Sequence, residues 1–325
     1  MAKRTCPVLI LLAILLTACQ PAAVESGDLM KIRLPMGFIP NIQYAPFYVA
    51  VERGYFADAG FEIEFDYSFE TDGVALTAAG EVPFAIVSAE QVLLARAQGL
   101  PVVYVTAWYQ DTPVAVVAKS ESGIAAPQDL VGRRIGLPGL FGASYIGLRA
   151  LLAEFDIPEN EVTLDSIGFN QVQALAADQE EAIVGYVNNE PIQLSAKGYD
   201  VNVIRIADHV SLAANGIITN ETTIRENPEQ VRAFVAAFLR GLTDAIADPE
   251  SAYEISRTYV ETLADAKEAV EKEVLALSIE YWEADLLGQS HPEAWENMLA
   301  ILNEMELITV PVDINQAYTN EFLPE

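Results

Sequence analysis

The sequence predicts a two-lobed α/β protein, in which each lobe is a sheet flanked by helices, with a ligand cleft between the lobes and a helical C-terminal tail. Short apolar strands alternate with helical stretches through most of the chain, and this alternation falls into two units. From Pro228 onward the pattern is nearly all helical. Because strands that alternate with helices indicate parallel sheets, we expect two parallel α/β units.

The first lobe is expected to span residues 30–118, with residues 220–325 returning to complete it. Its strands show either polar/apolar alternation or short apolar runs, which are typical of half-buried and buried strands. The expected elements are strands at 31–37, 61–67, 83–88, 102–108 and 113–119 and helices at 45–55 and 90–98. Pro46 falls in the first turn of the 45–55 helix, where proline is tolerated.

The second lobe is expected to span residues 119–219. Residues 120–139 predict a loop, a short helix and a strand, and residues 215–220 predict a strand that returns to the first unit. Between them we expect helices at 143–155, 171–178 and 191–197 and strands at 162–168, 181–187 and 201–206. Ligands of open α/β sheets lie beyond the carboxyl ends of strands and often between domains, so the cleft should be lined by the loops there.

The N-terminus indicates export and lipid anchoring. Lys3 and Arg4 precede a short apolar stretch at 8–16, which is too short to span a bilayer. Residues 16–19, Leu-Thr-Ala-Cys, resemble the lipobox of bacterial lipoproteins, in which the cysteine is acylated. We therefore expect a signal peptide at 1–18, a lipid anchor at Cys19 and a tether at 19–29, on the outer face of the cell membrane. Secretion without an anchor is the alternative.

Composition excludes several classes of protein. The chain has 325 residues and a net charge of −29, and such a surface repels the phosphates of nucleic acids. The hydrophobic fraction of 52% is too high for a disordered chain. Cleavage before Cys19 would remove Cys6, so we expect neither an internal disulfide nor a thiolate metal site.

The sequence lacks the motifs of common enzymes. Its two histidines, His209 and His291, are far apart, and there is no nucleophile elbow, zinc-protease helix, P-loop or dinucleotide-binding glycine pattern. Acidic pairs are common, but a chain this acidic contains them by chance. We therefore expect no catalytic residue, no metal and no cofactor, and a monomer that binds a small molecule.

Six segments at the expected strand ends should line the cleft, and none contains lysine or arginine. Sulfonates and phosphates normally require such cations, although a helix N-terminus near residues 142–144 could replace one. The segments are 40–47, 65–73, 88–91, 106–112, 138–146 and 186–191. They are rich in aromatic side chains, which stack on flat rings, and in amides, which offer both donors and acceptors.

From these segments we select ligand-binding candidates that combine aromatic rings with directional polar groups. They are Asn41, Gln43, Tyr44, Tyr67, Ser88, Glu90, Tyr109, Phe141, Gly142, Ser144, Tyr145, Asn188, Asn189 and Glu190. Phe47 or Tyr48 should instead face the core, and one of Trp108 and Tyr109 should do so too. Residues 188–190 are equally consistent with a capping turn before a helix. Trp282 and Trp295, in the helical tail, should be structural.

Three stretches, 40–65, 130–142 and 185–191, resemble the family of solute-binding proteins that serve ABC importers of sulfonates, thiamine-pyrimidine precursors and riboflavin. The resemblance implies a type II periplasmic-binding-protein fold, with an ABC permease and its ATPase as partners. The thiamine-precursor branch typically has a histidine where this chain has Tyr44 and often a glutamate where it has Leu140. Both departures favour a larger, flatter aromatic solute.

Riboflavin is therefore the first expected ligand, with a thiamine pyrimidine precursor as the alternative and an aliphatic sulfonate third. In the mechanism that the resemblance implies, an open cleft captures the solute, the lobes close, and the closed form docks on the permease. Two rival functions are a pyrimidine-forming enzyme and a sensor subunit that presents ligand to a receptor.

Overall fold

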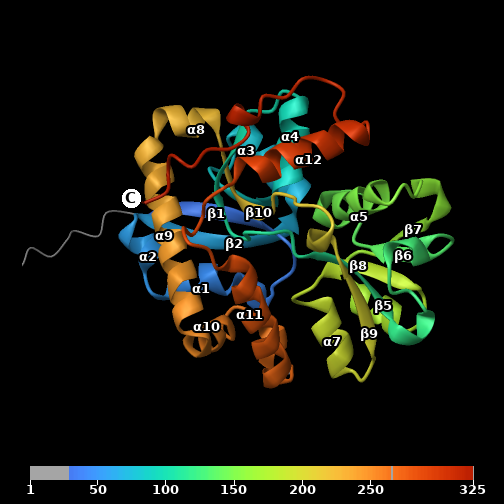
Figure 1. The fold of residues 1–325 in the computed structure, drawn as a ribbon. Helices are drawn as coiled ribbons and strands as arrows, with labels where there is room; N and C mark the ends of the chain where they lie inside the picture. The colour runs from blue at the N-terminus through green and yellow to red at the C-terminus, as the bar shows by residue number, and fades with distance from the viewer. Residues whose placement is uncertain (1–28, 265, 325) are drawn as a thin grey trace, which may run out of the picture.

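The computed structural model describes residues 29–264 and 266–324, so the expected signal peptide, tether and Cys19 lie outside the described residues. Two lobes are visible in Figure 1, with β1, β2 and β10 in one and β5–β9 in the other. Each lobe combines strands with packed helices, as the sequence predicts. The fold is the expected two-lobed α/β fold.

The first lobe contains a parallel pair, β1–β2, and a three-stranded sheet in the order β3-β10-β4. Its strands are β1 (Met30–Gly37), β2 (Phe61–Phe69), β3 (Ala85–Ser88), β4 (Val102–Ala107) and β10 (Asn215–Asn220). Strands β3, β4 and β10 are buried along their whole length, so their sequences show no polar/apolar alternation.

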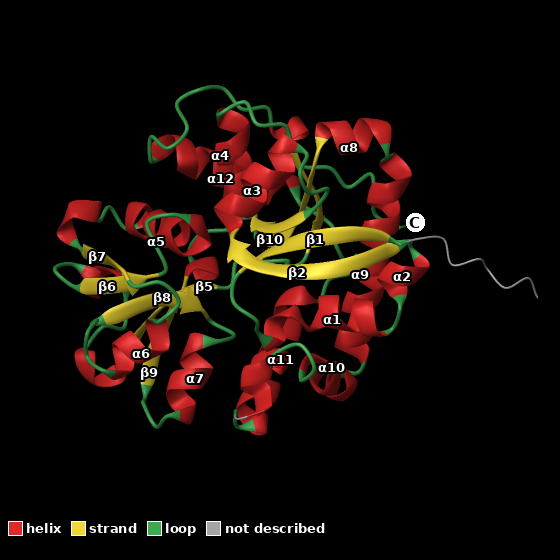
Figure 2. Cartoon of the chain, turned by 180° about the vertical axis from the view of Figure 1, so that it is seen from behind, coloured by secondary structure: helices red, strands yellow, loops and turns green. Residues whose placement is uncertain are grey.

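Helices cover both sides of these strands, with α1, α9 and α10 on one side and α3, α4 and α12 on the other (Figure 2). Their bounds are α1 (Ala45–Glu52), α2 (Tyr55–Asp58), α3 (Glu70–Ala79), α4 (Ala89–Ala97), α8 (Glu221–Glu226), α9 (Pro228–Ala247), α10 (Pro249–Ser256), α11 (Glu268–Trp282) and α12 (Pro292–Glu304). The single helix expected over 45–55 is two helices, because Gly54 adopts a φ of +75° that ends the first.

The second lobe is built on one five-stranded sheet in the order β7-β6-β8-β5-β9. Its strands are β5 (Val114–Lys119), β6 (Arg134–Leu137), β7 (Thr163–Ser166), β8 (Ala182–Tyr186) and β9 (Val201–Arg205). Its helices are α5 (Gly142–Glu154), α6 (Gln171–Ala176) and α7 (Glu190–Ala196). Single turns of 3₁₀ helix complete the chain at Ile42–Tyr44, Ser120–Ser122, Pro127–Leu130, Glu159–Glu161, Ile206–Asp208, Glu261–Ala264 and Ile314–Gln316.

Not all strands run parallel to their neighbours, which corrects one expectation. Strand β5 runs antiparallel to β8 and β9, and β10 runs antiparallel to β3 and β4. These two strands carry the chain from one lobe into the other. No helical crossover within the same sheet precedes them, so nothing forces them to lie parallel to their neighbours.

The same strands move the expected lobe boundaries. β5 lies almost wholly within the range expected for the first lobe but pairs with second-lobe strands. β10 pairs with first-lobe strands, in keeping with a strand that returns to the first unit, although the expected boundary at 219 falls inside it. The hydrophobic runs reveal the strands but not their partners, because both are equally apolar. We propose that the chain changes lobe just before Val114 and just before Asn215.

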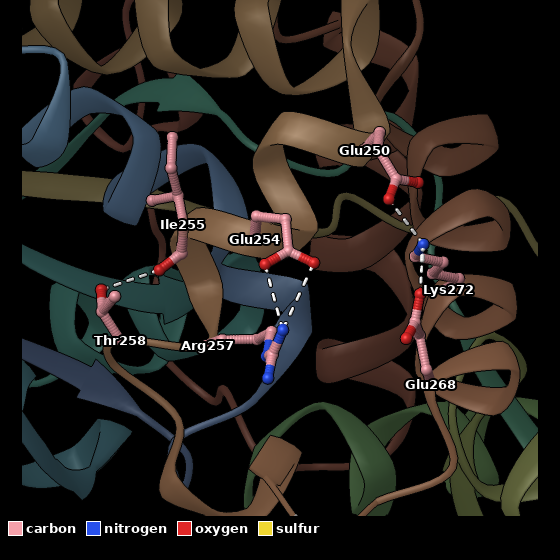
Figure 3. Close-up of polar contacts among 7 residues, drawn as sticks. All are labelled: Glu250, Glu254, Ile255, Arg257, Thr258, Glu268 and Lys272. Atoms are coloured by element: carbon pink, nitrogen blue, oxygen red, sulfur yellow. Dashed lines mark hydrogen bonds and ion pairs between the residues drawn. The ribbon is translucent and has the colours of Figure 1, made fainter.

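The C-terminal helices are tied together at the surface and also contact the second lobe. Lys272 of α11 donates to Glu250 of α10 over 2.7 Å and pairs with Glu268 over 2.6 Å (Figure 3). On another part of α11, Glu271 accepts from the Gln193 amide over 2.8 Å. Helix α11 therefore links the tail to the second lobe beside the cleft. Within residues 29–264 and 266–324, no helix is both long and apolar enough to cross a membrane.

Candidate functional site

A cavity of about 840 Å³, including its open mouth, lies between the lobes. Both lobes contribute to its wall. The first lobe contributes Met36, Gly37, Phe38, Gln43, Tyr44, Phe69, Glu70, Trp108, Tyr109 and Asn215. The second contributes Pro138, Phe141, Gly142, Ala143, Ser144, Phe169, Gln171, Gly185, Tyr186, Asn189 and Glu190. None of these lining residues is a lysine, an arginine or a histidine, as expected from the sequence.

The inner wall is a set of buried aromatic rings held in fixed positions. Tyr44 stacks on Trp108 with ring centroids 5.2 Å apart and planes 23° apart, and its hydroxyl donates to the Met36 carbonyl over 2.5 Å. Burial raises the pKa of Tyr44, so the hydroxyl keeps its proton. Phe47 and Tyr48 are fully buried in the core, as expected. Trp108 and Tyr109 both reach the cavity, whereas only one was expected to.

Amide side chains fix the Tyr109 ring from behind. Its hydroxyl accepts from Gln43 Nε2 over 3.2 Å and from Asn188 Nδ2 over 3.1 Å. Asn188 Nδ2 also lies 2.8 Å from Ser278 Oγ of α11, so this amide joins the second lobe to the tail. Burial raises the pKa of Tyr109 to about 12. The inner wall is therefore preorganised and uncharged.

Four phenylalanines meet near the mouth of the cavity. Phe38 and Phe69 come from the first lobe, and Phe141 and Phe169 come from the second. Phe38 packs edge-on against Phe169 at 4.6 Å, and Phe69 contacts Phe141 at 5.7 Å. Phe69 and Phe141 remain 42% and 41% exposed, which is unusual for rings of this size. These phenylalanines bridge the lobes where a ligand would enter.

The second-lobe floor is organised by Glu190 at the start of α7. Its carboxylate accepts from the Tyr186 backbone N–H over 2.7 Å and from Asn189 Nδ2 over 2.9 Å. A side chain at Gly185 would leave no room for this arrangement, because a Cβ there would lie 2.5 Å from Glu190 Oε2. Burial raises the pKa of Glu190. Asn189 and Glu190, at the start of α7, line the cavity, whereas Asn188 does not.

A carboxyl group also faces the cavity from the first lobe. Glu70, at the start of α3, accepts from Asn215 Nδ2 over 3.1 Å and contacts Ser88 Oγ over 2.5 Å. Asn215 Oδ1 accepts in turn from the Tyr186 hydroxyl across the cleft over 2.8 Å. Burial and the neighbouring Glu90 together raise the pKa of Glu70 to about 8. Within the described residues, no group of three or more potential metal ligands is gathered.

Eight of the predicted ligand-binding residues line the cavity. They are Gln43, Tyr44, Tyr109, Phe141, Gly142, Ser144, Asn189 and Glu190. They come from the three segments 40–47, 106–112 and 138–146 and from the start of α7. We propose them as ligand contacts.

The other predicted residues lie outside the cavity lining. Asn41 caps the turn at 42–44 by accepting from the Gln43 N–H. The Tyr67 hydroxyl bonds to Tyr48, and the Tyr145 hydroxyl contacts Glu159 and Arg149, so both rings are turned away. Asn188, Ser88 and Glu90 are buried behind the wall and act on it through Tyr109 and Glu70.

Seven lining residues were outside every predicted segment: Met36, Gly37, Phe38, Phe169, Gln171, Gly185 and Asn215. Phe38 lies between the expected strand at 31–37 and the segment 40–47, which began too late to include it, and Phe169 lies in the loop after β7, where no segment was predicted. Asn215 begins β10, where the antiparallel direction brings the strand's amino end to the cleft. That position could not be predicted while the strand was assumed to be parallel.

A second, more polar groove adjoins the cavity and shares Phe38, Phe169, Gln171, Asn189 and Glu190 with it. Its empty volume is about 1500 Å³, and its lining adds hydroxyl, amide and carboxylate side chains from both lobes. These include Asn41, Gln173, Gln193, Tyr259, Glu261, Thr262 and Glu271, together with Lys197. The cleft as a whole therefore has an aromatic chamber and a polar extension.

Residues 41–252 match the family described as NMT1/THI5 like. The chain belongs to this family. It is 40% identical to the riboflavin-binding protein RibY of Chloroflexus aurantiacus, over 97% of this chain and 96% of that protein. It is 28% identical to the formylaminopyrimidine-binding protein of Halalkalibacterium halodurans, over 96% of this chain and 97% of that one.

More distant relatives include an enzyme. A 4-amino-5-hydroxymethyl-2-methylpyrimidine phosphate synthase of Legionella pneumophila is 25% identical, over 91% of this chain and 93% of that protein. Among solved structures, the alkanesulfonate-binding protein SsuA of Xanthomonas axonopodis pv. citri superposes with a TM-score of 0.73 at 14% identity, covering 90% of this chain and 99% of that one. This likeness shows the fold that the family shares, which is the periplasmic-binding-protein fold.

Proposed function

We propose that this chain is the extracytoplasmic solute-binding protein of an ABC importer and that its solute is riboflavin. The observation that carries the proposal is the cavity lined by stacked aromatic rings without any cation. A flat, neutral heterocycle gains from stacking on such rings, whereas an anion would find no charged partner. The 40% identity with a riboflavin-binding relative over nearly the whole chain agrees with this choice.

The isoalloxazine ring would lie in the aromatic chamber, against Tyr44, Trp108 and Tyr109. The Trp108 Nε1–H is buried and has no hydrogen-bond partner among the described residues, so it is available to a carbonyl of the ligand. The amides of Gln43 and Asn189 supply further donors and acceptors. The ribityl chain would extend into the polar groove, which offers the hydroxyl and amide partners that a polyol needs.

The working cycle follows from the two lobes. An open cleft captures the solute, the lobes rotate together, and the closed form presents itself to a permease with its ATPase. This cycle requires no covalent chemistry, and neither histidine lines the cavity. We therefore propose a binding protein rather than an enzyme, acting as a monomer and anchored through Cys19 to the outer face of the cell membrane.

The direct test is a titration of riboflavin with the mature chain carrying Cys19→Ser, followed by quenching of flavin fluorescence. We expect saturable quenching at submicromolar concentrations, and about tenfold or greater weakening in Trp108→Ala, because the variant loses both a stacking surface and a donor. The matched control is Trp295→Phe, which changes a buried tryptophan remote from the cavity. An absence of quenching by the folded protein would refute riboflavin as the ligand.

A thiamine pyrimidine precursor is the alternative solute, favoured by the 28% identity with a formylaminopyrimidine-binding relative. Such a ring would fill less of the chamber and would leave the polar groove empty. Competition separates the two: formylaminopyrimidine that displaces riboflavin at equal concentration would favour the smaller ligand. We expect it to leave the quenching unchanged.

A further inference from the structure

A pair of carboxyl groups behind the first-lobe wall has a hydrogen-bond pattern that two ionised groups cannot make. Ser88 Oγ contacts Glu70 Oε2 over 2.5 Å and also contacts Glu90 Oε1. A serine hydroxyl carries one hydrogen, so it can donate to only one of these oxygens. If both carboxyls were ionised, the other contact would place two lone pairs against each other at hydrogen-bond distance.

One additional proton resolves this conflict. A protonated carboxyl can donate to Ser88 Oγ while the serine hydroxyl donates to the other carboxylate, which gives a continuous chain of two hydrogen bonds. Glu90 Oε1 also accepts from Gln91 Nε2 over 3.2 Å, so this oxygen has two donors and is better suited to the negative charge. Glu70 Oε2 has no donor other than Ser88 within the described residues, so Glu70 is the better carrier of the proton.

The surroundings favour a single negative charge for the pair. Glu90 is 1% exposed and Ser88 is 1% exposed, and neither carboxyl has an ion pair among the described residues. The titratable groups that face the pair are the hydroxyls of Tyr44, Tyr104 and Tyr186, all of which keep their protons. Glu90 is buried and Glu70 is half-buried, with no cation paired to either among the described residues, and this is the situation in which such a pair retains one proton.

We propose that Glu70 and Glu90 share one proton through Ser88, carried by Glu70, and that this proton makes Glu70 a neutral positioning residue for an uncharged ligand. Glu70 lines the cavity, whereas Glu90 lies behind it, so the proton sits where a ligand would contact it. Loss of this proton would leave an ionised Glu70 carboxylate against the electron-rich edge of a heterocycle. The effect on the ligand rests on the proposed function, but the shared proton does not.

The shared proton can be tested without ligand. We expect the infrared carbonyl band of a protonated carboxylic acid in the ligand-free protein at neutral pH, and we expect this band to disappear on alkaline titration. Glu70→Gln should remove it, while Glu271→Gln, at a buried carboxyl in the adjoining groove that contacts Gln193, should leave it in place. A neutral-pH spectrum without the band, or a band unchanged in Glu70→Gln, would overturn the shared proton.

The effect on the ligand is tested by riboflavin titrations from about pH 6 to about pH 9. Only the form of the protein with a protonated Glu70 favours binding. The affinity for riboflavin should therefore be constant at the acid end of this range and should fall by up to about tenfold per pH unit once the pair ionises. Glu70→Gln preserves the shape of the side chain and a hydrogen-bond donor. The variant should therefore bind riboflavin at neutral pH like the natural chain, but its affinity should no longer depend on pH. A retained pH dependence in Glu70→Gln would overturn the positioning role.

Failure of the two proposals can be told apart. If riboflavin does not bind at any pH while the infrared band is present and depends on Glu70, the proposed ligand and the positioning role fail but the shared proton stands. If riboflavin binds with the same affinity across the whole range, the ligand stands and the positioning role fails. A pH-dependent affinity that disappears only in Glu70→Gln supports both.

Discussion

The two walls of the cleft are built differently. On the first-lobe side, Tyr44, Trp108 and Tyr109 are almost fully buried, and two of the three rings have fixed hydroxyl partners. On the second-lobe side, Phe141 is 41% exposed and precedes Gly142, whose φ of +74° is accessible mainly to glycine. One wall is therefore preorganised, while the other has a rim that can still lose exposed surface when a ligand binds.

This difference has a physical consequence for binding. A preorganised wall costs little entropy on binding, so it can set which ring is accepted. An exposed aromatic rim gains buried area only when the lobes meet, so it can make closure dependent on the ligand. We infer that the first lobe determines specificity and that the second-lobe rim contributes to retention.

The largest effect is expected at the one rigid part of the second-lobe wall. Gly185→Ala would place a Cβ 2.5 Å from Glu190 Oε2 and so displace a buried carboxylate from its backbone donor. We expect a loss of about 2–3 kcal/mol in the free energy of unfolding, since overpacking and a broken buried hydrogen bond combine. Urea unfolding measures it.

A second substitution checks the cause. Adding Glu190→Ala to Gly185→Ala removes the clashing atoms, so the double variant should be more stable than the sum of the single changes predicts. Additive effects would mean that the clash is not with Glu190. The second-lobe floor would then be as adaptable as its rim, and the second-lobe wall would have no rigid part.

The next effect concerns Glu70 and the dependence of stability on pH. Its pKa is raised to about 8, so in the range from its ordinary pKa up to about 8 the folded chain holds a proton that the unfolded chain releases. The contribution of Glu70 to stability is therefore fully present at acid pH and is lost as the pH rises through about 8. Glu70→Gln cannot ionise and avoids this loss.

We therefore expect Glu70→Gln to be more stable than the natural chain by about 1–2 kcal/mol near pH 8 and to match it near pH 4.5. Urea unfolding at the two pH values measures both numbers. Equal stabilisation at both values would show that the gain comes from packing rather than from the proton. A loss at pH 8 would mean that the carboxylate is needed as an acceptor for Asn215.

The sequence predicted some features of the fold and of the site but not others. Hydrophobic periodicity revealed the strands, the helices and the tail. Burial of one face sets the spacing of apolar residues along a strand or helix, whichever element packs against it. Strand direction was not visible, since β5 and β10 are buried throughout and show no alternation that depends on their orientation. As a result, Asn215 was missed.

Within the site, the sequence located the aromatic wall but not its polar support. Strand-end loops pointed to Tyr44, Tyr109 and Glu190 because connectivity alone brings such loops to the cleft. The contact of Ser88 with both Glu70 and Glu90 depends on how β3, α3 and α4 pack, and no local pattern encodes that packing. In a chain this acidic, the two glutamates could not be distinguished from surface carboxylates.

Substitutions of Phe69 and Phe141 at the rim should have a smaller effect on riboflavin binding. The effects of the two substitutions should be coupled, because the two rings come from different lobes and contact each other. Phe69→Ala and Phe141→Ala each remove one side of a contact that joins the lobes at 5.7 Å. We expect each change to weaken riboflavin binding about threefold to tenfold, mainly through faster release, with a coupling of about 0.5–1.5 kcal/mol in the double variant. Stopped-flow dissociation measures it.

Leu140→Ala is the matched control for the rim, because this neighbour is 51% exposed and does not line the cavity. It should leave the release rate unchanged. If Phe141→Ala instead slowed association and left release unaltered, the rim would guide entry rather than retain the ligand.

The smallest effect is expected at Tyr145, which the sequence placed in the site and the fold turns away from it. Its hydroxyl contacts Glu159 and accepts from Arg149 over 2.7 Å on a partly exposed surface, where such contacts contribute little. Tyr145→Phe should change riboflavin affinity by less than about twofold and stability by less than about 0.5 kcal/mol. Because Ser144, one residue earlier, lines the cavity, this variant tests whether α5 presents only that face to the ligand. A clear loss of affinity would mean that α5 rotates when the lobes close, and the second-lobe wall would then be mobile along its helix as well as at its rim.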